Sequence, residues 1–406
     1  MNILLVSSYL PYPLFSGGHI RLYNLIRELS KKHRITLICE KRDYQGELEI
    51  KKLKKFCKKV ITVPRKKQWS LGNIVRTGLS FSPFLITGHT SKLMREEIKS
   101  AISESQFDLI HVETSYVMQN LPAGNLSIPV VLVEHNIEYL VYKRFADNAP
   151  LILRPLLYLD VAKLKYWEER MWKKATKLVA VSNIEKKIMS KIRKDVIIVP
   201  NGVDIAKFNS AIQNQSSRFK VHQGEKRILF IGEFKWVQNI NAIEWILKEI
   251  WPKLRAEFTR QINNREIKLW VVGRDIPSSI RKLTNDKSVF FDENAPLETE
   301  LIYQNAYLLL APIKVGGGTS FKILEGMASG VPVITTPLGN AIGAKEDSEI
   351  LIANDSEGFV GKTLELLEND ELYEEISKNA RKFIEENYDW GVITKKLESV
   401  YESAAS

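Results

Sequence analysis

The chain of 406 residues is poor in cysteine, with only Cys39 and Cys57. Two cysteines form neither a metal-ligand spacing nor a disulfide framework, which predicts a protein of the reducing cytoplasm. No apolar run is long enough to cross a bilayer, and the start, MNILLVSSYLPYP, lacks the basic region of a signal peptide. The sequence has no Asp-x-Asp pair and no histidine cluster, so we expect no essential metal.

Acidic residues are scarce in the first half of the chain. Residues 1–200 hold 34 Lys and Arg against 18 Asp and Glu, a balance of +16, whereas the whole chain carries +11. The basic excess concentrates at 51–67 and 163–177. Such a face attracts nucleic acid, acidic lipid headgroups or phosphorylated substrates, and a solvated helix face accounts for either run equally well. Since no nucleic-acid-binding motif occurs, we expect no nucleic-acid partner.

Short apolar, β-branched runs alternate with longer segments of helical period. Strands are predicted at 2–8, 34–40, 60–63, 108–113, 129–135, 177–182, 227–233, 267–273, 289–291, 307–312, 331–336 and 349–353. Continuous apolar strands separated by helices predict parallel sheets buried on both faces. Because the pattern occurs twice, we expect an α/β protein of two doubly wound, Rossmann-like domains facing each other across a cleft.

The domain boundary is expected near VIIVPNGVD (196–204), where a strand ends in a Pro-Asn-Gly turn. We place the first domain at 1–205 and the second at 227–385. The stretch 206–226 is polar, has almost no apolar period and is typical of a linker.

Two candidate ligand loops lie in the first domain. Gly17 and Gly18 precede a predicted helix, where small residues let a ligand approach the backbone and helix N–H groups attract an anion. A tight turn explains the two glycines as well, and the dinucleotide fingerprint G-x-G-x-x-G is absent. His135 and Asn136 end a predicted strand, which places them at the edge where ligands bind in such sheets.

A third loop, IKVGGGTSFKILEGMA (313–328), follows a strand in the second domain. Glycines 316–318 would expose their amides, Thr319 or Ser320 can cap the helix, and the helix N-terminus attracts a phosphate. Lys322 in the first turn opposes the helix dipole, and a bound diphosphate would explain it. Glu325, three residues on, is expected on the same side, where a carboxylate can accept hydrogen bonds from ribose hydroxyls.

These motifs together resemble the retaining family 4 glycosyltransferases of GT-B fold (glycosyl transferases group 1). The resemblance covers nearly the whole chain and rests on Gly17–Gly18 and on the segments EHN (134–136), VPNGVD (199–204), GGGTSFKILEGMASGVPVITT (316–336) and YDWGVITKKLESVY (388–401). It implies that the first domain binds the acceptor and the second binds a nucleotide sugar. It also implies that the last helix, 386–406, packs back on the first domain.

The resemblance implies roles for individual residues. Glu325 is similar to the acid that binds the ribose hydroxyls, and His135 to the histidine beside the transferred sugar. The loop Gly317, Gly318, Thr319 and Ser320 is similar to the one whose amides contact the donor, and Gly17 and Gly18 to the loop that closes on the diphosphate.

The chain also departs from the family pattern. Gly317 stands where many members have a first glutamate that touches the donor sugar, and Glu233 and Gln238 replace a usual Arg and Lys. We therefore expect Lys322, Lys235 and Arg274 to bind the diphosphate. The donor site is further expected to include Gly273 and, from a W-x-x-N segment that some members share, Asn239.

The resemblance implies transfer of a sugar from a UDP- or GDP-sugar to a hydroxyl of a glycan or a lipid-linked saccharide, with retention of configuration. Lys322 and the helix N-terminus would stabilise the leaving diphosphate. We expect a hexosyltransferase of polysaccharide biosynthesis with no cofactor, in the cytoplasm or peripheral on the inner face of an anionic membrane. A nucleotide-sugar 2-epimerase of the same fold and a non-catalytic module that binds anionic surfaces remain alternatives. The sequence leaves open the base, the sugar, the acceptor, the linkage and the oligomeric state.

Overall fold

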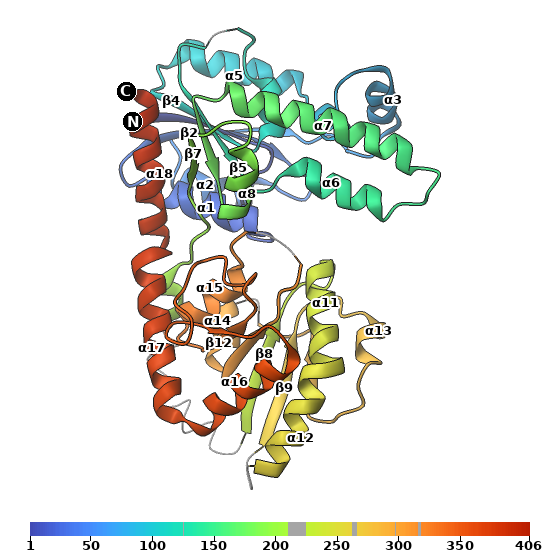
Figure 1. The fold of residues 1–406 in the computed structure, drawn as a ribbon. Coiled ribbons are helices and arrows are strands. Elements are labelled where there is room, and N and C mark those ends of the chain that lie inside the picture. The colour runs from blue at the N-terminus through green and yellow to red at the C-terminus, as the bar shows by residue number, and fades with distance from the viewer. Residues whose placement is uncertain (125, 210–224, 262–265, 297, 316–317) are drawn as a thin grey trace. The chain divides into compact units, whose positions relative to one another are not determined.

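The computed structural model describes the chain except for residues 125, 210–224, 262–265, 297 and 316–317 (Figure 1). It consists of two compact units. The first comprises Met1–Pro200 together with Ile393–Ser406, and the second comprises Asn201–Val392.

The first unit contains a parallel sheet of seven strands in the order β3-β2-β1-β4-β5-β6-β7. Its strands are β1 (Asn2–Ser7), β2 (Arg34–Lys41), β3 (Lys59–Pro64), β4 (Leu109–Glu113), β5 (Val130–Glu134), β6 (Lys177–Ala180) and β7 (Val196–Ile198). The first six coincide with predicted strand runs, and β7 lies in the segment 196–204, where a strand is expected to end in a turn. The pairing of β1 with β4 places Ser7 opposite Glu113, at the carboxyl ends of both strands.

Helices cover both faces of this sheet, as Figure 1 shows for α5 and α7 on one face and α1 on the other. The helical segments are α1 (Gly17–Leu29), α2 (Glu47–Lys54), α3 (Leu71–Leu79), α4 (Phe84–Gly88), α5 (Lys92–Glu104), η1 (Ser115–Asn120), α6 (Glu138–Asp147), α7 (Arg154–Lys174) and α8 (Asn183–Met189). Ile98 of α5 and Trp172 of α7 pack with Leu4 and Val6 of β1 in one fully buried core.

The second unit contains a parallel sheet of six strands in the order β10-β9-β8-β11-β12-β13. Its strands are β8 (Glu225–Ile231), β9 (Glu266–Val272), β10 (Val289–Asp292), β11 (Leu308–Ala311), β12 (Val333–Thr335) and β13 (Leu351–Ile352). Two parallel sheets of this kind confirm the predicted fold class.

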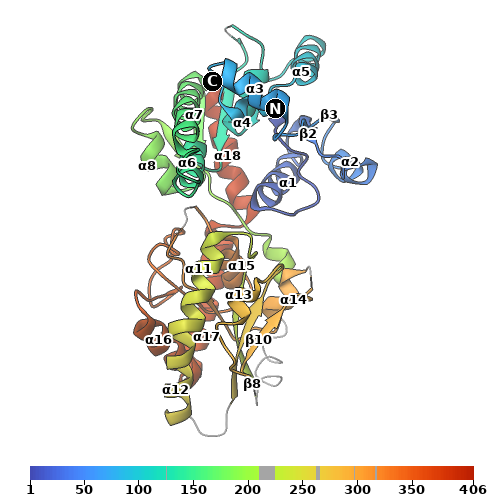
Figure 2. The same ribbon diagram turned by 90° about the vertical axis from the view of Figure 1, so that its right-hand side faces the viewer.

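The helices of the second unit also form two layers, and Figure 2 shows α11 and α12 in front of the sheet. The helical segments are η2 (Ile205–Phe208), α11 (Val237–Trp245), η3 (Ile246–Ile250), α12 (Trp251–Gln261), α13 (Ser278–Arg281), α14 (Thr299–Gln304), α15 (Phe321–Ala328), α16 (Ser356–Glu368) and α17 (Asp370–Asn387). Phe230 of β8 packs with the α11, α12 and α16 layer, and Leu229 packs with the α14, α15 and α17 layer.

The stretch 206–226, predicted as a linker, lies within the second unit, and both of its ends belong to regular elements. Phe208 is buried against the ring of Tyr303, so residues 206–208 are part of η2 rather than of a polar connection. Residues 210–224 lie outside the described part, and β8 begins at Glu225, two residues before its predicted start. The last helix is α18 (Trp390–Ala405). In the first unit its Glu398 bonds to His33 at 3.0 Å. Across the described ranges, no helix is both long and apolar enough to traverse a membrane.

Candidate functional site

The strand order of the second sheet reverses between β8 and β11, and ligands of open α/β sheets bind at such a point, beyond the carboxyl ends of the strands. The loop after β8 begins at Gly232, and the loop after β11 leads to α15. A Cβ atom on Gly232 would lie 2.7 Å from Cγ of Asn239. Only glycine therefore lets α11 come this close to the strand end.

Helix α15 begins where the sequence predicts a phosphate-binding N-terminus. Ser320 is the N-cap residue, one of the two expected, and its side chain forms no capping hydrogen bond within the described chain. Thr319 is buried. Gly318 has a φ of 80°, a backbone conformation that residues other than glycine rarely adopt. Gly317, also expected here, lies outside the described residues.

Lys322 is the most unusual group of this site. It is half-buried, donates from Nζ to Oδ1 of Asn239 at 2.8 Å and lies 4.8 Å from the centroid of the Phe230 ring. Burial lowers the pKa of Lys322 from 10.5 to about 7. Asn239 is oriented in turn by donating to the carbonyl of Glu233 at 2.8 Å. The W-x-x-N segment thus serves to position the lysine.

Glu325 contacts different elements from Lys322, so the two side chains do not pair with each other. The hydroxyls of Tyr303 and Thr299 lie beside the Glu325 carboxyl group and favour its charged form. Burial raises the pKa of Glu325 to about 7, although the nearby Lys207 opposes the shift. The Tyr303 hydroxyl also donates to the backbone carbonyl of Lys322 at 3.1 Å, which ties α14 to the first turn of α15.

The other predicted donor residues have simpler surroundings. Lys235 forms an ion pair with Glu233 at 2.5 Å and is mostly exposed, and Arg274 is exposed after β9. A Cβ atom on Gly273 would lie 2.1 Å from the carbonyl oxygen of Gly232. Packing between the strand ends therefore explains Gly273 without a ligand.

Three residues of this site have no counterpart in the sequence predictions. Lys314, in the same glycine loop, places Nζ 3.3 Å from the centroid of the Trp245 ring. Tyr303 and Thr299 lie on a short helix whose sequence shows no motif, so nothing in the chain pattern points to them. Lys314 could have been found from its position in the loop after β11.

Gly17 and Gly18 are helical rather than part of a loop, which corrects the predicted loop. They are the first two residues of α1, behind the N-cap Ser16, whose Oγ accepts from the amide of His19 at 3.4 Å. A Cβ atom on Gly18 would lie 3.1 Å from the Tyr9 hydroxyl and 3.4 Å from Nδ1 of His135. The fold thus brings His135 and Gly18 together. They lie where the strand order of the first sheet reverses, between β1 and β4.

His135 is held by a buried polar network that starts at Glu113, the last residue of β4. Nε2 of His135 donates to Oε1 of Glu113 at 2.5 Å, and Nε2 of His111 lies 2.5 Å from its Oε2. Although burial opposes ionisation, the neighbouring His135 and His111 hold the pKa of Glu113 well below its usual range. Nδ1 of His111 contacts the hydroxyl of Tyr401 of α18 at 2.5 Å.

The orientation of His135 follows from this network. Because Nε2 faces a carboxylate it carries a proton, and Nδ1 is the ring nitrogen that faces Gly18. Glu113 was not predicted, since nothing in a strand-ending acid distinguishes it from others before the fold is known.

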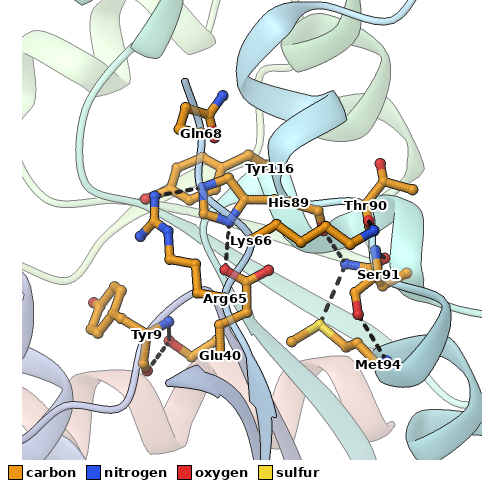
Figure 3. A network of polar contacts seen from close by, with 12 residues as sticks. Tyr9, Glu40, Arg65, Lys66, Gln68, His89, Thr90, Ser91, Met94 and Tyr116 are labelled. Atoms are coloured by element: carbon orange, nitrogen blue, oxygen red, sulfur yellow. Dashed lines mark hydrogen bonds and ion pairs between the residues drawn. The ribbon is translucent and has the colours of Figure 1, made fainter. Parts of the chain in front are cut away.

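A second buried network stands at the ends of β2 and β3. Nδ1 of His89 bonds to Oε2 of Glu40 at 2.8 Å, and its Nε2 lies 3.3 Å from Nη2 of Arg65. Figure 3 shows the His89 ring between these two partners with the Tyr116 ring behind it. The network joins the segment after α4 to two strands. Over the described ranges, no group of three or more His, Cys, Asp or Glu side chains is arranged to hold a metal ion.

Both halves of the chain match models of one enzyme family. Residues 15–207 match the model described as Glycosyltransferase Family 4, and residues 225–369 match the one described as Glycosyl transferases group 1. The chain therefore belongs to family 4 of the glycosyltransferases. It is a retaining enzyme that transfers a sugar from a nucleotide sugar.

Individual relatives cover nearly the whole chain. A Klebsiella pneumoniae protein, described as an uncharacterized 44.6 kDa protein in the cps region, is 26% identical, with 96% of each chain covered. The phosphatidyl-myo-inositol mannosyltransferase of Mycolicibacterium smegmatis is 22% identical, with 85% of each covered. The structure of Anabaena HepE with UDP and glucose has a TM-score of 0.62 at 13% identity and covers 99% of this chain and 100% of its own.

Proposed function

We propose that this enzyme transfers a hexose from a UDP- or GDP-sugar to a hydroxyl of a glycan or a lipid-linked saccharide. The observation that carries the proposal is Lys322. Burial lowers the pKa of this lysine to about 7, and its position in the first turn of a helix opposes the helix dipole. The negative charge of a bound diphosphate would stabilise its ammonium form. The relative named as a phosphatidyl-myo-inositol mannosyltransferase, whose acceptor is by that name a lipid, supports a lipid-linked acceptor.

In the proposed donor site, the diphosphate lies at the N-terminus of α15. The amides that follow Ser320 and the ammonium group of Lys322 bind its oxygens. Glu325, which Tyr303 and Thr299 position, accepts hydrogen bonds from the ribose hydroxyls. In this proposal, further positive charge near the diphosphate comes from Lys314, Lys235 and Arg274.

The chemistry that we propose is a same-face displacement. The bond between the anomeric carbon and the diphosphate breaks, the acceptor oxygen bonds to that carbon from the same face, and the acceptor proton passes to the leaving phosphate oxygen. Lys322 and the helix N-terminus stabilise the negative charge that develops on the leaving group. His135, which Glu113 orients, is proposed to lie beside the transferred sugar.

A panel of nucleoside diphosphates and their sugars tests the donor site. A ligand present at a hundred times its dissociation constant stabilises the folded state by about 2.7 kcal/mol, so the matching nucleotide should raise the melting temperature by several degrees. Lys322→Gln and Glu325→Gln should reduce this shift, whereas Lys378→Gln on α17 serves as a control lysine outside the site. A shift of equal size in all variants would refute the site.

The proposed site of action is the inner face of a membrane, where lipid-linked saccharides are presented. The +16 balance of residues 1–200 supports attraction to anionic headgroups. Product analysis with the matched donor and a lipid-linked saccharide tests the acceptor class and, from the anomeric configuration, retention. If the enzyme alters the nucleotide sugar but does not glycosylate the acceptor, the epimerase alternative is favoured instead.

A further inference from the structure

Helix α3 exposes its apolar face to solvent. Leu71, Ile74 and Leu79 recur at helical spacing, and Leu71 and Leu79 are 82% and 85% exposed. The one buried residue of α3 is polar: Asn73, whose amide donates to two backbone carbonyls that precede the helix. A helix of a folded unit normally buries its apolar face, so this reversed orientation indicates a partner outside the unit.

A second apolar segment lies beside α3, although it is about 70 residues away in sequence. The turn between α6 and α7 exposes Ile152 to 88%, and more apolar side chains of residues 145–159 are exposed around it. Trp69 shares an apolar hollow of about 400 Å³ with Phe145 and Leu156. Nζ of Lys163 on α7 donates to two carbonyls at the end of α3, at 3.0 and 2.8 Å. The two segments therefore form one surface.

We call the exposed apolar side chains of residues 69–81 and 145–159 the α3–α7 surface. Figures 1 and 2 show α3 close to α7, with α6 running alongside α7. Of the 27 large apolar side chains that are exposed in the described chain, 13 lie on this surface. Isolated exposed apolar residues need no explanation, but such a concentration marks an interaction site.

The charges around the surface identify its partner. Residues 65–81 and 143–165 hold nine Lys and Arg against two Asp and Glu, and no acid occurs between Glu49 and Glu96. A second copy of this chain would bring equal positive charge to the same place, which disfavours self-association. Apolar side chains within a basic rim match the boundary between anionic headgroups and acyl chains.

We propose that the α3–α7 surface docks on an anionic lipid bilayer. The apolar side chains enter the headgroup region, and Lys67, Arg76 and Arg154 lie against lipid phosphates. The docking itself is independent of the donor site, but its purpose of bringing the enzyme to a lipid-linked acceptor rests on the proposed function.

Vesicle flotation of the full chain tests the proposal, with vesicles that contain about one third phosphatidylglycerol at about 0.1 M salt. Leu79→Ser with Phe81→Ser should lower the partition coefficient at least tenfold. The matched control, Leu48→Ser with Phe290→Ser, removes exposed residues of the same types elsewhere and should change it less than twofold. Lys67→Gln with Arg76→Gln should lower it by about fivefold for each charge.

The outcomes separate docking from donor binding. If the Leu79 and Phe81 variant binds vesicles like its control, or if neutral vesicles bind equally well, docking by this surface is wrong. If wild type is a dimer that this variant dissociates, the surface is an interface between copies and the proposal is likewise overturned. The nucleotide-induced melting shift checks that each variant is folded. It should be unchanged in all of them, and its loss in wild type would refute the donor site alone.

Discussion

Nucleotide binding should be accompanied by proton uptake at Lys322. In the free enzyme burial alone lowers the pKa of Lys322 to about 7, without a charged neighbour among its causes. A bound diphosphate would favour the charged form and restore a pKa near the ordinary value. The complex therefore binds more protons than the free enzyme between pH 7 and about 10.

The expected magnitude follows from this shift. If Lys322 is fully charged in the complex, its amino group takes up about 0.9 proton at pH 8, about 0.5 at pH 7 and about 0.1 at pH 6. Through Lys322 alone the affinity should fall roughly fiftyfold from pH 7 to pH 9. Glu325, with a pKa of about 7, releases a proton when ribose hydroxyls stabilise its carboxylate, but at pH 8 this is only about 0.1 proton. Measurements at pH 8 thus isolate the lysine.

Titration calorimetry in buffers of different ionisation enthalpy measures this uptake directly. Lys322→Gln should bind the nucleotide more weakly and without uptake at pH 8, whereas Glu325→Gln should keep the uptake. Wild-type binding at pH 8 that leaves the number of bound protons unchanged would refute the idea that the diphosphate contacts Lys322.

Three further predictions concern the other groups. Glu113→Gln removes the carboxylate that orients His135, so kcat should fall at least tenfold with little change in the nucleotide melting shift. Glu40→Gln breaks a similar buried contact to a histidine elsewhere, and equal losses of kcat in both variants would argue against a specific role of Glu113. Glu325→Ala should abolish a preference for the nucleoside diphosphate over its 2′,3′-dideoxy form, measured as a ratio of dissociation constants; a preference that survives would exclude the ribose role. Gly18→Ala places a methyl group 3.1 Å from the Tyr9 hydroxyl, and we expect steady-state assays to show lower kcat without loss of nucleotide binding, so unchanged turnover would count against this crowding.

The fold could be predicted because its signals are local. Runs such as ILLV at the start of the chain are apolar throughout, which indicates strands covered on both faces, and all the predicted strands formed. The boundaries were less predictable. Phe208 is one apolar residue in a polar stretch, and its burial against Tyr303 depends on a residue 95 positions away. No periodicity within the segment records such a contact.

The candidate site could be predicted only where its residues share a loop or helix. Thr319, Ser320 and Lys322 were found because a cap, a glycine loop and a base adjoin in sequence. Glu113 and Tyr303 act on predicted residues from strands and helices that only the fold brings near. The spacing of Lys322 and Glu325 predicts that the two lie on the same side of the helix, but it could not predict that each contacts its own partners rather than the other.

Lys322 also shows how local disagreement can indicate function. A lysine in a first turn opposes the helix dipole, and its burial against Phe230 costs further free energy. For such a group the folded pKa lies below the unfolded one, so the unfolded state binds more protons above pH 7 and the lysine destabilises the free enzyme at neutral pH. Lys322→Met should therefore raise the melting temperature of the free enzyme while it weakens nucleotide binding. This combination is expected of a ligand-binding residue, which destabilises the free protein and gains a partner when the ligand binds. If Lys322 were structural, the same substitution would lower the stability of the folded protein.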